Sequence, residues 1–120
     1  MLSRIATEFA AEIRDHDWSD APYRIDRAGH RREHDGRHKS EDVLDDGKTD
    51  RLRINVVWVT AQVLMHADPN LDLAEFALAC GVDRDFIYKS GRRVNGWLTN
   101  GIRVDMEGRV TPPGNEDLDK

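Results

Sequence analysis

Basic and aromatic side chains are concentrated between residues 84 and 93 of this 120-residue chain. Arginine and lysine bind phosphate oxygens, and arginine and tyrosine can also hydrogen-bond the edges of nucleobases. If residues 84–94 form a helix, its outward face is rich in such groups. They are Arg84, Asp85, Tyr88, Lys89 and Arg92, followed directly by Arg93. The chemistry available to this segment is therefore contact with a nucleic acid.

The sequence around this segment predicts two short helices joined by a turn. In the first helix, apolar residues recur at the i, i+3, i+4 and i+7 spacing of a half-buried face. They are Leu73, Phe76, Ala77 and Cys80. Gly81 can adopt the left-handed conformation that ends this helix, and Val82 can fill the angle between the two helices. Asp83 is a suitable cap for the second helix, which returns Ile87 to the core.

Residues 71–94 resemble the helix-turn-helix of bacterial and phage transcription regulators, over about a fifth of the chain. The resemblance implies that Gly81 is the turn residue, that Ala77 and Ile87 pack against each other, and that the helix from Arg84 lies in the major groove. Phosphate contacts would then come from Lys89, Arg92 and Arg93, and base contacts from Arg84 and Tyr88. Ser90 and Gly91 depart from the usual pattern of the second helix. A plain helical hairpin without DNA contact has the same apolar spacing.

Residues 102–111 predict a small β-hairpin. Ile102, Val104 and Val110 flank a Met-Glu-Gly turn. A hairpin after the recognition helix resembles the wing of winged helix-turn-helix regulators, which implies that Arg103 and Arg109 contact the DNA backbone. The alternative is a hairpin that only covers the core. Asn95-Gly96 and Asn100-Gly101 are both turn signals, and either could end the helix-turn-helix unit of residues 71–98. Residues 112–120 read as a loose acidic tail.

Two further helices are predicted before this region. Residues 3–16 form an amphipathic pattern capped by Ser3, with an apolar face that packs on the domain or on a second subunit. That face carries Leu2, Ile5, Ala6, Phe9, Ala10 and Ile13. Residues 49–67 are the most hydrophobic stretch and favour a buried helix, with a strand as the alternative. The helical face that we expect to be buried carries Leu52, Val56, Val59 and Val63.

Residues 17–48 have few apolar side chains and predict a long, charged and irregular segment. His30, His34 and His38 recur every four residues within it and would share one face if the segment were helical. Such a face could hold a divalent metal ion. Gly36 and the absence of an apolar face argue against a helix, so we expect a solvated loop and no metal.

Composition limits the class of protein. The chain has a net charge of −5, with 38% hydrophobic and 34% charged residues, and its length suits one domain. The acidic balance argues against a protein that coats DNA without sequence preference. Residues 81–110 are the locally positive part, with six basic and four acidic side chains. The 14 arginines against 4 lysines suggest GC-rich codons and a bacterial or phage source.

Other features favour a cytoplasmic binding protein. No apolar run is long enough to span a membrane, and residues 1–15 lack the pattern of a secretory signal. The single Cys80 excludes an intrachain disulfide and reads as a small buried hydrophobe. No nucleophile with a positioned base and no phosphate-binding glycine loop is present, so we expect neither an enzyme nor a cofactor.

The sequence therefore predicts a mainly α, small helical domain over residues 1–111, with a helix-turn-helix and a short C-terminal β-hairpin. The expected function is sequence-specific binding of double-stranded DNA by a small transcriptional regulator of phage or mobile-element type. A homodimer on a two-fold site is the expected assembly. The alternative is a protein-protein interaction module that uses the same scaffold and binds a partner through Leu2, Ile5, Phe9 and Ile13.

Overall fold

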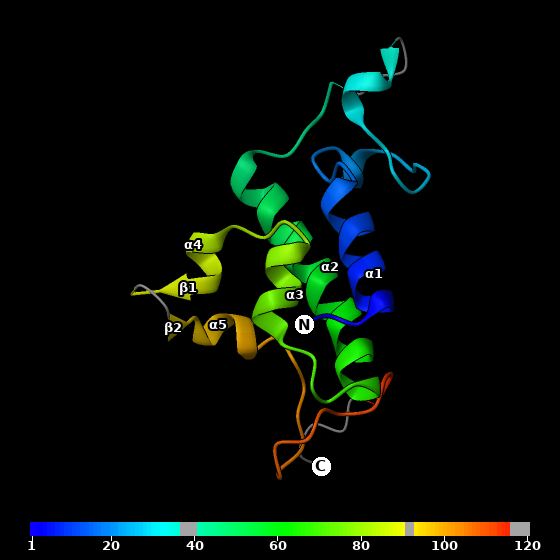
Figure 1. Ribbon diagram of the computed structural model, residues 1–120. Coiled ribbons are helices and arrows are strands. Elements are labelled where there is room, and N and C mark those ends of the chain that lie inside the picture. Colours follow the sequence, from blue (N-terminus) through cyan, green and yellow to red (C-terminus); the bar gives the residue numbers. More distant parts are fainter. Residues whose placement is uncertain (37–40, 91–92, 116–120) are drawn as a thin grey trace.

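A computed structural model describes residues 1–36, 41–90 and 93–115 (Figure 1). Within these ranges the chain is mainly helical with one short antiparallel hairpin, which confirms the predicted fold class. The helices are α1 (Arg4–Asp15), α2 (Asp46–Ala67), α3 (Leu73–Ala79), α4 (Arg84–Ile87) and α5 (Gly96–Thr99), and the strands are β1 (Tyr88–Lys89) and β2 (Arg93–Val94). Two 3₁₀ turns, η1 (Ala21–Tyr23) and η2 (Arg32–His34), lie between α1 and α2. None of the helices in the described ranges has the length and apolarity that crossing a membrane requires.

Helix α1 forms where the sequence predicted it. The Ser3 hydroxyl accepts a hydrogen bond from the Ala6 backbone N–H at 3.2 Å, which satisfies one of the free donors of the first turn. Ala6, Ala10 and Ile13 face the core, and Ile5 and Phe9 remain exposed. Only one side of the predicted apolar face is therefore covered by the rest of the chain.

Helix α2 is longer than predicted and begins at Asp46 instead of residue 49. The Asp45 carboxylate accepts from the Lys48 backbone N–H at 2.8 Å, so the cap lies inside the segment that the sequence predicted to be irregular. The strand alternative for this stretch is excluded. The chain leaves the helix at Asp68, because Pro69 disfavours helical geometry in the residue before it.

The buried face of α2 differs from the prediction. Val59 is 72% exposed and Val63 is 49% exposed, whereas Ile54, Val57 and Ala61 are buried. Valines occur on several faces of this helix, so the apolar pattern does not fix its rotation. Long-range polar contacts do fix it, because the buried Gln62 amide donates to the Arg103 and Thr111 carbonyls and accepts from the Arg103 N–H.

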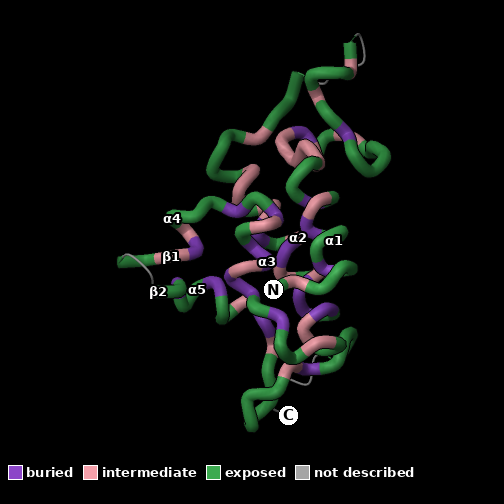
Figure 2. The backbone as a smooth tube through the Cα atoms, in the orientation of Figure 1, coloured by how far each residue is buried: buried purple, intermediate pink, exposed green. Residues whose placement is uncertain are grey.

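Helix α3 lies at the centre of the core and contacts α1, α2 and α4. Its Phe76 and Ala77 are fully buried, and Leu73 and Ala74 are nearly so. Figure 2 shows buried stretches of α1, α2 and α3, in purple, in the middle of the molecule. Alanines on the facing helices, including Ala6 and Ala61, allow this close approach.

The turn after α3 matches the predicted geometry. Gly81 has a φ of 92°, a left-handed conformation that glycine adopts without steric strain. Val82 and Ile87 are buried in the same cluster as Ala77, and the Asp83 carboxylate accepts from the Asp85 backbone N–H at 2.9 Å. The structure thus contains a helix, a glycine turn and a second helix in the order expected.

The second helix is much shorter than predicted. Helix α4 is a single turn that ends at Ile87, and Tyr88 is already extended. Tyr88 and Lys89 belong to β1, which pairs with β2 in the register Tyr88↔Val94 and Lys89↔Arg93. Ser90 has a φ of 48°, at the end of β1, where a continuous helix would need a negative φ. The low helix propensity of Ser90 and Gly91, together with the pairing offered by Val94, accounts for the early end of the helix.

The C-terminal region is less regular than the predicted hairpin. Helix α5 begins after Asn95 and ends at Asn100, so the two Asn-Gly pairs bracket it. In residues 102–111 the only strand pairing described is an isolated antiparallel bridge between Val104 and Val110. The Asp105 carboxylate shapes the intervening turn by accepting from the Glu107 and Arg109 N–H groups. Of the predicted acidic tail, residues 116–120 lie outside the described residues.

Replacing Gly101 with alanine tests the packing of α5 against α2. A Cβ at this position would lie 1.9 Å from the Trp58 ring, which is held by a 2.9 Å hydrogen bond from its indole N–H to the Leu98 carbonyl. We expect Gly101→Ala to lower the free energy of unfolding by about 1–3 kcal/mol, measured by urea denaturation. Gly96→Ala is the matched control, because a Cβ there has open space. Equal stability of the two variants would contradict the packing.

The burial of Cys80 predicts an unreactive thiol. Cys80 is fully buried, and burial raises the pKa of its thiol to about 12. Because the thiolate is the reactive form, a disulfide reagent at pH 8 should label the native protein far more slowly than the urea-unfolded protein. Labelling of both forms at the same rate would show that Cys80 is accessible.

Candidate nucleic-acid interface

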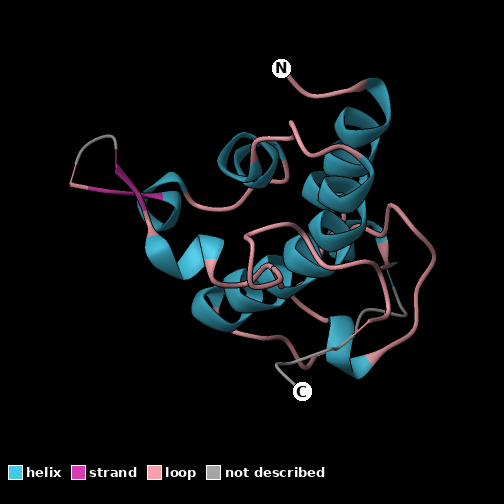
Figure 3. Ribbon diagram, turned by 90° about the horizontal axis from the view of Figure 1, so that it is seen from below, coloured by secondary structure: helices cyan, strands magenta, loops and turns pink. Residues whose placement is uncertain are grey.

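The β1–β2 hairpin projects from the helical body (Figure 3). Its base is closed by Asn95, which is buried. The Asn95 backbone N–H donates to the Ile87 carbonyl at 2.8 Å, and its side-chain amide donates to the Phe86 carbonyl at 2.9 Å. The same side chain accepts from the Trp97 backbone N–H at 3.1 Å and so caps α5. One residue thus fixes the end of α4 to the start of α5, with the hairpin between them.

Two cations lie side by side on this hairpin. Lys89 and Arg93 are directly opposite each other in the strand register, which places their side chains on the same face. Both residues are exposed, and neither forms an ion pair with another residue in the described ranges. Like charges in this position repel each other. A bound anion would remove that repulsion.

Arg84 and Tyr88 lie beside this pair in the chain, but Tyr88 directly precedes Lys89 on β1 and therefore points to the opposite face of the hairpin. The Arg84 guanidinium lies over the Tyr88 ring, 4.9 Å from its centroid, which is a cation–π contact. Arg84 is exposed, and Asp83 and Asp85 flank it. The structure therefore brings Arg84, Tyr88, Lys89 and Arg93 together at α4 and the hairpin, although not on one helix. Arg92 lies outside the described residues.

Arg103 and Arg109 are engaged elsewhere. The Arg109 guanidinium forms ion pairs with Asp105, at 3.1 Å, and with Glu107. The backbone N–H of Arg109 and its side chain hold the pKa of Asp105 below its usual value. The Arg103 side chain donates to the Asn115 carbonyl at 3.1 Å. These arginines stabilise the 102–115 region, and their donors are partly used by the chain itself.

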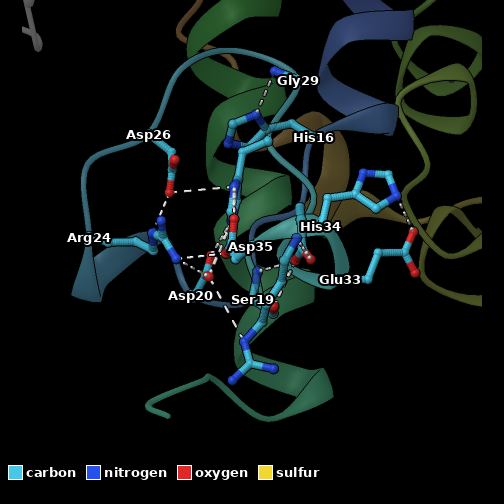
Figure 4. A network of polar contacts seen from close by, with 12 residues as sticks. His16, Ser19, Asp20, Arg24, Asp26, Gly29, Glu33, His34 and Asp35 are labelled. Carbon is cyan, nitrogen blue, oxygen red and sulfur yellow. Dashed lines mark hydrogen bonds and ion pairs between the residues drawn. The ribbon is translucent and has the colours of Figure 1, made fainter. Parts of the chain in front are cut away.

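A second polar site lies in the segment between α1 and α2, and sequence reasoning missed it (Figure 4). Asp20 is fully buried, and its two carboxylate oxygens each lie 3.2 Å from His30 Nε2. On the other side of the ring, His30 Nδ1 lies 3.4 Å from Asp26 and 3.6 Å from Asp35. The prediction of a solvated histidine loop is therefore wrong for His30, which is buried.

Arginines complete this network. Arg24 pairs with Asp35 at 2.7 Å, with Asp26, and at 3.9 Å with Asp20. The Arg32 guanidinium also lies 3.9 Å from Asp20. We refer to Asp20, Arg24, Asp26, His30, Arg32 and Asp35 as the polar cluster.

The polar cluster resembles a metal site in part. Asp20, His30 and Asp35 each offer a ligand atom, and these atoms lie within 4.8 Å of one another. The two guanidiniums, however, already neutralise the same carboxylates. The arrangement is therefore that of an ion-pair network which holds a segment with few apolar residues. His30 and His34 do not share a face, because His30 is buried whereas His34 is exposed beside Glu33, and His38 lies outside the described residues.

Neighbouring groups are perturbed by this environment. Burial, and then the proximity of His30, lowers the pKa of His16, whose ring also packs on Trp18 with centroids 4.5 Å apart. Burial by itself would raise the pKa of Asp17, but hydrogen bonds from Ser19 and from the Arg32 backbone N–H lower it overall. Apart from the density of charged residues, nothing in the sequence indicates these contacts.

The described residues form a small, mainly helical protein in which a glycine turn joins α3 to α4 and a cationic hairpin follows. Comparison of this chain with protein-family models, with curated proteins and with solved structures finds no match. The proposed function therefore depends on the chain's own residues.

We expect the polar cluster to stabilise the folded protein. Asp20→Asn removes a buried negative charge that faces His30, Arg24 and Arg32, and leaves those side chains without their central partner. We expect a loss of about 3 kcal/mol or more in the free energy of unfolding, measured by urea denaturation. Glu33→Gln, which alters an exposed contact with His34, should have little effect. An Asp20→Asn variant as stable as the Glu33→Gln variant would contradict a stabilising role for the cluster.

Proposed function

We propose that this protein binds double-stranded DNA in a sequence-specific manner, as a small transcriptional regulator of phage or mobile-element type. The observation that carries the proposal is the pair of exposed, opposed cations Lys89 and Arg93 on the projecting hairpin. Two such side chains on one face can contact successive phosphates, and phosphate contact would relieve their repulsion.

In this proposal, the hairpin and α4 together enter the major groove and contact the bases. The major groove admits a two-stranded ribbon as well as a helix, so the short α4 does not prevent entry. Arg84 and Tyr88 lie at the junction of α4 and β1 and are the side chains proposed to reach base edges. Arg103 and Arg109 would add weaker backbone contacts, because their guanidiniums already bind oxygens of the chain.

The charge distribution supports specific over general binding. The chain carries a net charge of −5, so much of its surface repels DNA, and the cationic hairpin is a locally positive surface that can attract it. One small module contacts few base pairs, so we propose that two copies bind a two-fold site. The exposed Ile5 and Phe9 on α1 are the surface proposed for that contact.

The same α1 surface favours a second candidate function, which is binding to a different protein. Ile5 is 52% exposed and Phe9 is 44% exposed, one helical turn apart. Of the predicted partner-binding residues, Ile13 is buried in the core and could not take part. Loss of a partner on Phe9→Ala, with no DNA binding by the wild type, would favour this candidate.

The salt dependence of DNA binding tests the main proposal. Sequences selected from a random duplex pool are titrated with the wild type and with the Lys89→Ala/Arg93→Ala double variant across a salt series. Each lost phosphate contact should reduce the slope of log affinity against log salt by about 0.9, so the double variant should lose about 1.8. Arg4→Ala is the matched control, because Arg4 is an exposed arginine on α1 that pairs with Glu8.

The proposal fails if the wild type selects no sequence and binds no duplex at low salt. It also fails if the double variant and the Arg4→Ala control have the same slope, because the hairpin would then make no phosphate contact.

A further inference from the structure

A cleft lined by three aromatic rings lies beside the hairpin, between α2, α4 and α5. Its walls are Trp58 from α2, Phe86 from α4 and Trp97 from α5, with Ile54 at its base and Arg51 and Asn55 at its rim. We refer to it as the aromatic cleft. Its volume is about 280 Å³, slightly below the roughly 300–1,000 Å³ of pockets for drug-sized ligands, so it suits one flat ring system.

The most exposed wall of the aromatic cleft is Trp97. Trp97 is 73% exposed. The Trp58 indole, in contrast, is partly buried and donates to the Leu98 carbonyl. A tryptophan offers a large flat face on which another ring can stack. Exposed on a short helix, Trp97 does little for the core, which indicates that its face is available to a ligand.

The aromatic cleft is held open by the residue that closes the hairpin. Asn95 donates to the Phe86 carbonyl and accepts from the Trp97 N–H, at 2.9 Å and 3.1 Å. The backbones of these two wall residues are thus fixed to one buried side chain before any ligand binds. A site fixed in this way loses little conformational entropy on binding.

Two polar side chains at the rim of the aromatic cleft could bind polar groups of a ligand. Arg51 and Asn55 are one turn apart on α2 and exposed, and neither forms an ion pair or side-chain hydrogen bond with another residue in the described ranges. An asparagine amide presents a donor and an acceptor that match the edge of adenine. The guanidinium of Arg51 matches a phosphate. A nucleotide presents both groups, because its planar base is joined through a sugar to a phosphate.

We propose that the aromatic cleft binds one unpaired nucleobase of DNA. This inference rests on the proposed function and adds a substrate class to it. Trp97 stacks on the face of the base, Asn55 bonds its edge and Arg51 contacts its phosphate. A base inside a regular duplex is stacked and cannot enter the cleft, so the preferred substrate is DNA with an extruded or bulged base beside the site held by the hairpin.

A bulged duplex tests this proposal. The probe carries one unpaired 2-aminopurine, a fluorescent analogue of adenine, and is compared with the same duplex fully paired. The wild type should bind the bulged duplex at least about tenfold more tightly and quench the probe by stacking. Trp97→Ala should bind both duplexes equally, with an unchanged affinity for the paired one. Val59→Ala is the control, since Val59 is as exposed on α2 but does not line the aromatic cleft.

The outcomes separate this proposal from the proposed function. Binding of the paired duplex through Lys89 and Arg93 with no preference for the bulge would overturn the cleft proposal alone. Binding of a single-stranded oligodeoxyadenosine that Trp97→Ala abolishes, without binding of paired duplex, would support the cleft and overturn the duplex function. Binding of an aromatic peptide but of neither DNA would overturn both. Trp97→Phe should retain the preference, and thermal unfolding confirms that each variant folds.

Discussion

The packing of α3 is the constraint on which the rest of the structure depends. This helix has seven residues, too few to be stable in water by itself, and it forms because Leu73, Ala74, Phe76 and Ala77 are buried among α1, α2 and α4. The alanines of the two longer helices, α1 and α2, set how closely these helices approach Phe76. Because α3 also begins the glycine turn, its position determines where α4 starts and therefore the direction in which the hairpin leaves the helical body.

The elements with strong local signals were predictable from the sequence, and those fixed by distant contacts were not. Ser3 with its apolar spacing predicted α1, and the Gly81 turn followed from one residue type. The end of α4 depends on bonds from Asn95, eight residues beyond Ile87. The rotation of α2 depends on Gln62 bonding to residues some 40 to 50 positions away. Local periodicity contains no information about such bonds, so the predicted helix ran on past Ile87 and the predicted valine face was wrong.

The candidate site was predictable by residue type and not by arrangement. Arg84, Tyr88, Lys89 and Arg93 were identified from their chemistry, and their joint location near one corner followed from sequence proximity. Their division between a helical turn and a hairpin did not. The polar cluster shows the opposite case, since the spacing of the histidines suggested a shared face that does not form. His30 instead pairs with Asp20 in an irregular segment, where no repeat reports on contacts. In that segment, the high density of charged residues was the only sequence feature that pointed to such contacts.

The closure of the hairpin at Asn95 leaves Lys89 and Arg93 outside the core, whereas Tyr88 packs against it. Because the backbone N–H of Asn95 donates to the Ile87 carbonyl and its side chain donates to the Phe86 carbonyl, residues beyond Tyr88 can change in sequence or length without repacking α3. The fold therefore works as a display scaffold, in which foreign loops could be grafted between Tyr88 and Val94 while the helices keep their positions. Variation at the tip would alter what the protein recognises, and the body would remain a constant support.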